Sequence, residues 1–300
     1  MNKLLNSSPI VSTVSTAGVG YAFENKIQAY YLLMLIMRVP VSDRLGPVVR
    51  LQFQGRYEGV ETDDLICTHV ASDRVTRVFM QCKLTVSLTE SDAAFGGALR
   101  KAWSDFTAAL ADPEHSFNVE TDRLALVYDA DCASPKLRAA RRLIQVAKNS
   151  INASDFSRKC SSREYREIVR ILSAIVQPGR DVDDHAQLLW GFLSSVELDP
   201  SSLGAEKSED LDKVMGAISD RTGDPSSSYM IWSTLVATAA SLNGHGATVD
   251  ASNLERLIDP HVLRLLKYND KQMGAGRGLP NFPWGAALWA DLDACEPRFA

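Results

Sequence analysis

The stretch from Gly59 to Lys83 constrains the fold more than any other part of the chain. Two short apolar runs lie on either side of a polar turn, a pattern typical of two neighbouring β-strands. Side chains two positions apart on a strand point to the same face, so Gln81 and Lys83 share a face. The acidic pair Asp63 and Asp64 stands where the first run begins. We therefore expect the acidic pair and the Gln-x-Lys to meet at one end of a sheet.

The flanking segments predict an α/β core. A helical stripe begins at Tyr21, after the breaker Gly18-Val19-Gly20, and ends at Pro40. Further strands and a helix of about twenty residues follow, and their order favours a mixed sheet covered by helices. The strands are expected over 48–53, 64–70, 77–84 and 123–129, and the helix over about 91–110. Beyond residue 134 the spacing is helical, and helices are expected over 136–150, 162–176, 185–195, 206–221, 229–242 and 251–266.

Composition is that of an ordinary globular protein. The chain has 300 residues, of which 45% are hydrophobic and 23% charged, enough apolar content for a sizeable core. The net charge of −5 argues against coating nucleic acid by bulk electrostatics alone. Five cysteines without a CxxC pair fit a reducing compartment and disfavour structural zinc. Without a signal peptide or a membrane-spanning run, we expect a cytoplasmic protein with no membrane partner.

The acidic pair with Gln-x-Lys suggests phosphodiester chemistry. Hydrolysis of a phosphodiester needs hard cations held by oxygen ligands and a group that orients the attacking water. Asp64 can supply a bridging carboxylate, Gln81 and the backbone carbonyl of Cys82 can supply neutral oxygens, and Lys83 can stabilise the developing charge. Glu24, in the first turn of the first helix, can add another carboxylate. Its alternative role is to compensate the helix dipole.

These residues resemble a known family. Gly20-Tyr-Ala-Phe-Glu24 opens the first helix, Gly59-Val-Glu-Thr-Asp-Asp64 precedes a strand, and Gln81-Cys-Lys83 ends the next strand. Together they resemble the PD-(D/E)xK nuclease superfamily, in the variant that carries D…QxK, as in Mrr-like restriction enzymes. More narrowly, they look like the N-terminal effector nucleases of bacterial anti-phage systems. Those include Cap4-type endonucleases and the nucleases fused to STAND NTPases in Avs proteins.

The resemblance implies a restriction-endonuclease-like core and a function in antiviral defence. It makes Glu24, Asp64, Gln81 and Lys83 the catalytic set of a Mg²⁺-dependent endonuclease that cuts double-stranded DNA, with Mn²⁺ as a substitute. Asp63 and Asp64 compete for the metal, because the family's Pro-Asp is here Thr-Asp-Asp. The implied partners are double-stranded DNA, further copies in a dimer or tetramer, and a fused or associated NTPase or sensor module.

The expected domain organisation follows the same division. We expect a flexible arm over residues 1–17, the nuclease-like core over 18–133, and a mostly helical region for assembly and regulation over 134–300. The chain is expected to be a module of a larger protein. An alternative is a catalytically silent, nuclease-like module that serves interaction and oligomerisation.

Basic residues are candidates for contacts with the DNA backbone. Segment 136–170 holds ten Lys and Arg residues against three acidic residues. Solvated helix faces explain most such charges, whereas a phosphate backbone is the functional alternative. The candidate contacts are Lys101, Arg138, Arg141 and Arg142.

Overall fold

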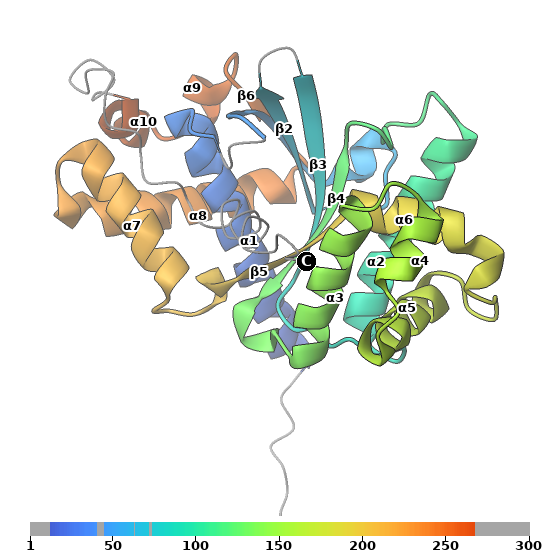
Figure 1. The fold of residues 1–300 in the computed structure, drawn as a ribbon. Coiled ribbons are helices and arrows are strands. Elements are labelled where there is room, and N and C mark those ends of the chain that lie inside the picture. The colour runs from blue at the N-terminus through green and yellow to red at the C-terminus, as the bar shows by residue number, and fades with distance from the viewer. Residues whose placement is uncertain (1–12, 41–44, 63, 72–73, 268–300) are drawn as a thin grey trace, which may run out of the picture.

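The computed structural model describes residues 13–40, 45–62, 64–71 and 74–267, which fold into three layers. A mixed sheet forms the middle layer, and helices cover both of its faces (Figure 1). The predicted α/β fold with a mixed sheet flanked by helices is therefore confirmed. Asp63 lies outside the described residues.

The sheet combines an antiparallel half with a parallel half. Its strand order is β5-β4-β3-β2-β1-β6. The pairs β1–β2, β2–β3 and β1–β6 are antiparallel, whereas β3–β4 and β4–β5 are parallel. The strands are β1 (Val48–Phe53), β2 (Leu65–Ala71), β3 (Arg74–Lys83), β4 (Arg123–Asp129), β5 (Val196–Ser201) and β6 (Thr248–Asp250).

The helices divide between the two faces of the sheet (Figure 1). One apolar core packs α1, α7, α8 and α10 against one face, and a second packs α2 to α6 against the other. The helices are α1 (Thr13–Met37), α2 (Ala93–Ala111), α3 (Pro135–Lys148), α4 (Ala153–Lys159), α5 (Arg163–Val176), α6 (Ala186–Ser195), α7 (Glu209–Thr222), α8 (Ser228–Gly244), α9 (Leu254–Leu257) and α10 (Pro260–Lys267).

Helix α1 is the central helix of its layer. From Ala29 to Met37 every residue is buried, as expected of a helix that is hydrophobic all round. The helix starts earlier than predicted and runs through Gly18 and Gly20. Each glycine costs a helix only about 1 kcal/mol relative to alanine, and a long buried helix tolerates that. The expected breaker therefore does not break the helix.

The strand and helix predictions were confirmed over most of the chain, with two strands missed. Strands β1 and β4 have the predicted bounds. Strand β5 contains Pro200, and its sequence is typical of a turn, but an edge strand tolerates proline. Strand β6 has only three residues, too few to show a period of two. The helix expected over 251–266 is divided into α9 and α10, and Pro260 opens the second.

The sheet includes strands from both predicted regions. Strands β5 and β6 come from beyond residue 133 and form the two edges of the sheet. The boundary at residue 133 stays a prediction, but the structure gives the helical region a direct part in the sheet. Within the described residues, no helix has the length and apolar character needed to cross a membrane.

Candidate functional site

Charged residues from three elements meet beside the carboxyl end of β3. Asp64 directly precedes β2, and its Oδ2 accepts a hydrogen bond of 2.7 Å from the backbone N–H of Cys82. The same oxygen lies 3.5 Å from Nζ of Lys83. The antiparallel register of β2 and β3 brings the start of one strand to the end of the other. The predicted meeting of Asp64 and Lys83 is present in the structure.

Glu24 of α1 joins this group through Gln28, one turn further along the helix. Nε2 of Gln28 donates to Oε1 of Glu24 and to the backbone oxygen of Asp64, both at 3.0 Å. Nδ2 of Asn243, from α8, donates to Oε1 of Glu24 at 2.6 Å. The amide of Gln28 thus links the two acidic residues, and the amide of Asn243, on α8, holds Glu24 in place.

The electrostatics of Glu24 reflect burial beside another carboxylate. Burial, and after it the negative charge of Asp64, raise the pKa of Glu24 to about 7. The hydrogen bond from Asn243, the charge of Lys83 and the hydrogen bond from Gln28 oppose this rise. Near neutral pH Glu24 therefore lies close to half-protonation, and a bound cation would favour its ionised form.

The other predicted metal ligands are placed differently. Cys82 contributes its backbone N–H to Asp64. Its thiol is buried among the residues under α1, where burial raises its pKa well above the usual value. Gln81 is 3% exposed and lines a small cavity with Thr62 and with residues of α2 and β4. The structure therefore brings Glu24, Asp64 and Lys83 together, whereas Gln81 is buried and borders a cavity that residues of α2 also line.

The predicted DNA contacts lie on α2 and α3, and most are engaged in contacts within the chain. Arg138 donates to the backbone oxygen of Ala133 at the start of α3, and Arg142 lies 3.9 Å from Glu164. Arg141 is half-buried near Asp199 of β5. Lys101 lies in α2 and also has an interaction partner. Their role toward DNA stays a prediction.

Further charged groups gather at the carboxyl ends of the parallel strands. Burial raises the pKa of Asp199, on β5, to about 7, while the nearby Arg141 lowers it. Nζ of Lys26, on α1, donates to the backbone oxygen of Gly204 at 3.0 Å. In open α/β sheets, ligands bind outside the carboxyl ends of the strands. The group of Glu24, Asp64 and Lys83 adjoins this edge.

Sequence reasoning missed the amides that organise the site. Gln28 follows Glu24 by four residues, a spacing that places both side chains on one helix face. That spacing could have identified Gln28. Asn243 lies 219 residues from Glu24, and nothing in its local sequence connects the two.

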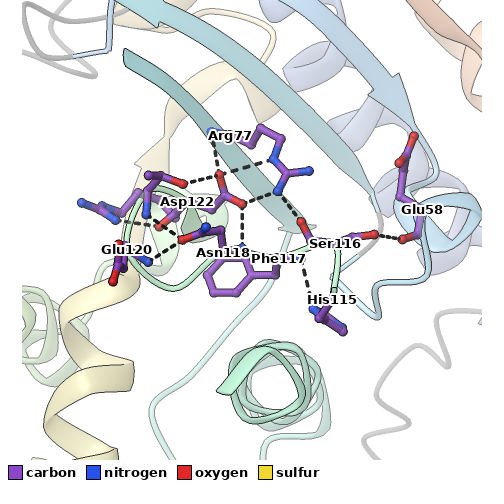
Figure 2. A network of polar contacts seen from close by, with 10 residues as sticks. Glu58, Arg77, His115, Ser116, Phe117, Asn118, Glu120 and Asp122 are labelled. Carbon is purple, nitrogen blue, oxygen red and sulfur yellow. Dashed lines mark hydrogen bonds and ion pairs between the residues drawn. The ribbon is translucent and has the colours of Figure 1, made fainter. Parts of the chain in front are cut away.

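A second polar network occupies the opposite end of β3, as Figure 2 shows. Nη2 of Arg77 lies 2.6 Å from Oδ2 of Asp122, and Nε of Arg77 donates to Oδ1 of the same carboxylate. The backbone N–H of Asn118 donates to Asp122 Oδ2 at 2.8 Å. Arg77 also donates to the backbone oxygen of Ser116. This network ties the loop before β4 to the start of β3.

Divalent cations fit the site beside Lys83 only in a particular way. Within the described ranges, no group of three or more His, Cys, Asp and Glu side chains could enclose a metal ion. Glu24 and Asp64 offer carboxylate oxygens, which are the ligands that Mg²⁺ prefers. Mg²⁺ usually keeps several waters and is held by one or two carboxylates together with the phosphates of a ligand. The residues present match that mode.

Solved structures with a similar arrangement are Cap4 SAVED/CARF-domain containing receptors. One, from Acinetobacter baumannii with the cyclic trinucleotide 3'3'3'-cAAA, shares 12% identity at a TM-score of 0.47, over 84% of this chain and 49% of that chain. Another, with 2'3'3'-cAAA, shares 14% at a TM-score of 0.43, over 88% and 48%. The Moraxella osloensis receptor shares 16% at a TM-score of 0.44, over 82% and 48%. This chain spans about half the length of these structures.

No family model matches the chain. No curated protein matches it either. The solved structures share with the sequence resemblance the name Cap4, but they are described as receptors and not as nucleases.

The comparison corrects the function expected from the sequence. The predicted Mg²⁺-dependent DNA endonuclease is wrong on this finding, because the similar structures are ligand receptors, two of them with a cyclic trinucleotide. The prediction that the chain is an enzyme is wrong on the same finding.

Proposed function

We propose that this chain is a binding module that recognises a phosphodiester-bearing ligand together with a divalent cation. The observation that carries the proposal is the grouping of Glu24, Asp64 and Lys83 beside the carboxyl end of β3. Two carboxylates repel a phosphate, whereas a divalent cation attracts both. Lys83 adds a positive charge that a phosphate oxygen can approach. The ligand and the cation therefore bind as a pair.

The cation would be held by the carboxylates of Glu24 and Asp64, with Mg²⁺ as the expected ion and Mn²⁺ as a substitute. When bound, it supplies positive charge that offsets the two carboxylates and an oxygen-preferring site for the ligand's phosphate. The chain's own residues orient these groups. The N–H of Cys82 fixes one oxygen of Asp64, and Gln28 connects Asp64 to Glu24.

The proposed ligand contains a phosphodiester, and experiments must show whether it is a cyclic oligonucleotide, a linear oligonucleotide or DNA. Two of the similar receptors are described with cyclic trinucleotides, so cyclic trinucleotides are the first probes. The sequence resemblance adds double-stranded DNA, further copies of the chain and an attached NTPase or sensor module as partners to test. We also propose a function in antiviral defence, from the same resemblance, and a cytoplasmic location, from the cysteine pattern.

Isothermal titration calorimetry tests the proposal directly. Cyclic triadenylate, linear triadenylate and a short DNA duplex are titrated into the protein, each with Mg²⁺ and with EDTA. We expect at least one ligand to bind tightly only with Mg²⁺, and Mg²⁺ to bind more tightly with that ligand by the same factor, as linkage requires. The variant Asp64→Asn should lose this coupling.

Two outcomes contradict the proposal. Equal ligand binding in Mg²⁺ and in EDTA would show that the carboxylates do not act through a cation. Recovery of the ligand in cleaved form after incubation with Mg²⁺ would contradict a function limited to binding. Chromatography of the ligand after each titration provides that measurement.

A further inference from the structure

We propose that Asn243 of α8 is a positioning residue for the cation site, an inference that rests on the proposed function. In this arrangement the amides occupy Oε1 of Glu24, so that Oε2 is the oxygen turned toward the cation. Asn243 does not contact the cation. It acts through the orientation of Glu24.

The hydrogen bonds around Glu24 support this division. Asn243 and Gln28 donate to the same oxygen, Oε1, at 2.6 and 3.0 Å. Gln28 comes from the same helix as Glu24, whereas Asn243 comes from α8, which packs beside α1 in the same core. Donors from two helices fix both the position and the rotation of the carboxylate. A fixed carboxylate loses less conformational entropy when it binds a cation.

Gln54 binds the end of the Asn243 amide that does not face Glu24. Its Nε2 donates to Oδ1 of Asn243 at 2.6 Å. The ionised carboxylate of Glu24 only accepts, so the NH₂ group of Asn243 faces Glu24 and its Oδ1 is left to accept from Gln54. Gln54 directly follows β1 and has a φ of 59°, an unusual conformation for a residue other than glycine.

The burial of Asn243 makes the contact persistent. Asn243 is 1% exposed, so water does not compete for its donor and acceptor groups. A buried amide that loses a partner carries a cost of about 1–3 kcal/mol, which favours the bonded arrangement. Replacing a residue that hydrogen-bonds a metal ligand typically lowers metal affinity by about 10- to 100-fold.

Gln52 provides a matched control on the same strand. It is buried like Asn243, and its Nε2 donates to the backbone oxygens of Phe53 and Gly246, at 2.9 and 3.0 Å. It therefore ties β1 to the segment just after α8, whereas Gln54 bonds to α8 itself, and its described contacts include neither Glu24 nor Asn243. Replacing it loosens the same region without changing the path to Glu24.

Titration with Mn²⁺, followed by the electron paramagnetic resonance signal of the free ion, tests the inference. We expect Asn243→Leu to weaken Mn²⁺ binding by about 10- to 100-fold. Gln54→Leu should weaken it less, and Gln52→Leu should leave it unchanged. Circular dichroism shows which variants are folded, and Gln54→Leu serves as the test if Asn243→Leu does not fold.

The outcomes separate the two proposals. If the wild-type chain binds no Mn²⁺ with or without ligand, the proposed function fails. If the wild type binds Mn²⁺ and the folded Asn243→Leu and Gln54→Leu variants bind it equally well, the positioning role fails and the proposed function stands. An equal loss in Gln52→Leu and Gln54→Leu would also overturn the positioning role, because it would reflect general loosening.

Discussion

The two ends of β3 place carboxylates beside basic side chains in different ways. At the amino end, the side chain of Asp122 is 2% exposed and lies 2.6 Å from Arg77 (Figure 2). At the carboxyl end, Asp64 lies 3.5 Å from Lys83, and Glu24 shares the same surroundings. The first arrangement matches one carboxylate with a guanidinium and backbone donors. The second gathers two carboxylates around one ammonium group.

This difference separates a structural network from a binding site. A guanidinium presents several donors in a fixed plane, so it can hydrogen-bond both oxygens of a buried carboxylate and balance its negative charge. At the other end the ammonium of Lys83 lies 3.5 Å from Asp64, and burial, with the negative charge of Asp64 after it, raises the pKa of Glu24. On the proposed function, the amino end of the strand contributes mainly to stability and the carboxyl end would bind the cation.

The largest expected effect is at the amino end. Asp122→Ala leaves the guanidinium of Arg77 and the N–H of Asn118 without their main partner, and breaking a buried ion pair costs about 3–5 kcal/mol. Urea denaturation at pH 7 measures the loss. Asp64→Ala is the comparison and should cost less, about 1–3 kcal/mol, because it removes the acceptor of the Cys82 N–H but no guanidinium pair. Equal losses in the two variants would remove the distinction between the two ends.

Glu24→Gln should increase stability above neutral pH. The pKa of Glu24 is about 7 in the folded chain against 4.5 for the free side chain. Between these values the folded state binds more protons than the unfolded state, so stability falls as pH rises. After allowance for partial exposure, the variant should gain about 1–2 kcal/mol at pH 8.

The pH profile tests the assignment to Glu24. Urea denaturation of the wild type from pH 5 to pH 8 should show a declining free energy of unfolding, and the variant should show a flatter profile. Parallel profiles for the two proteins would rule out Glu24 as the titrating group.

Mg²⁺ should stabilise the folded protein, and only through the site at the carboxyl end of β3. At a concentration about ten times its dissociation constant, a bound ion raises the free energy of unfolding by roughly 1.4 kcal/mol. Differential scanning calorimetry should show a higher melting temperature in Mg²⁺ for the wild type. The shift should vanish in Glu24→Gln, and a shift retained there would place the ion elsewhere.

The smallest effect is expected for Lys83→Met. Its ion pair with Asp64 is partly exposed and long, and such pairs contribute about 0–1 kcal/mol. The free energy of unfolding should change by no more than that, whereas binding of the phosphodiester ligand should weaken. A loss of several kcal/mol would make Lys83 a structural residue like Arg77.

Much of the fold was predictable because it depends on local patterns. The apolar runs that form β1 and β4 are bounded by polar or turn-forming residues, so their limits could be predicted from the sequence. Strands β5 and β6 were missed because their strand character comes from pairing at sheet edges, which short segments do not display. Tertiary pairing overrides local preference at such positions.

The site was predictable only where its residues lie near strand ends. Asp64 and Lys83 follow from the hairpin, because the register of two adjacent strands fixes their proximity. Asn243 could not be predicted, since its contact with Glu24 depends on the packing of two helices distant in sequence. The comparisons stand against the function inferred from resemblance, and residue types alone do not distinguish a site that cleaves from one that binds.

The placement of β5 and β6 at the two edges of the sheet has a consequence for synthesis. A growing chain can pair β1 to β4 early, but both outer strands of that sheet stay open until residues 196–201 and 248–250 have emerged. Open strand edges are templates for aggregation, and long-range pairing is slow. Asn243 emerges only a few residues before β6, so the site by β3 is completed as the last edge closes.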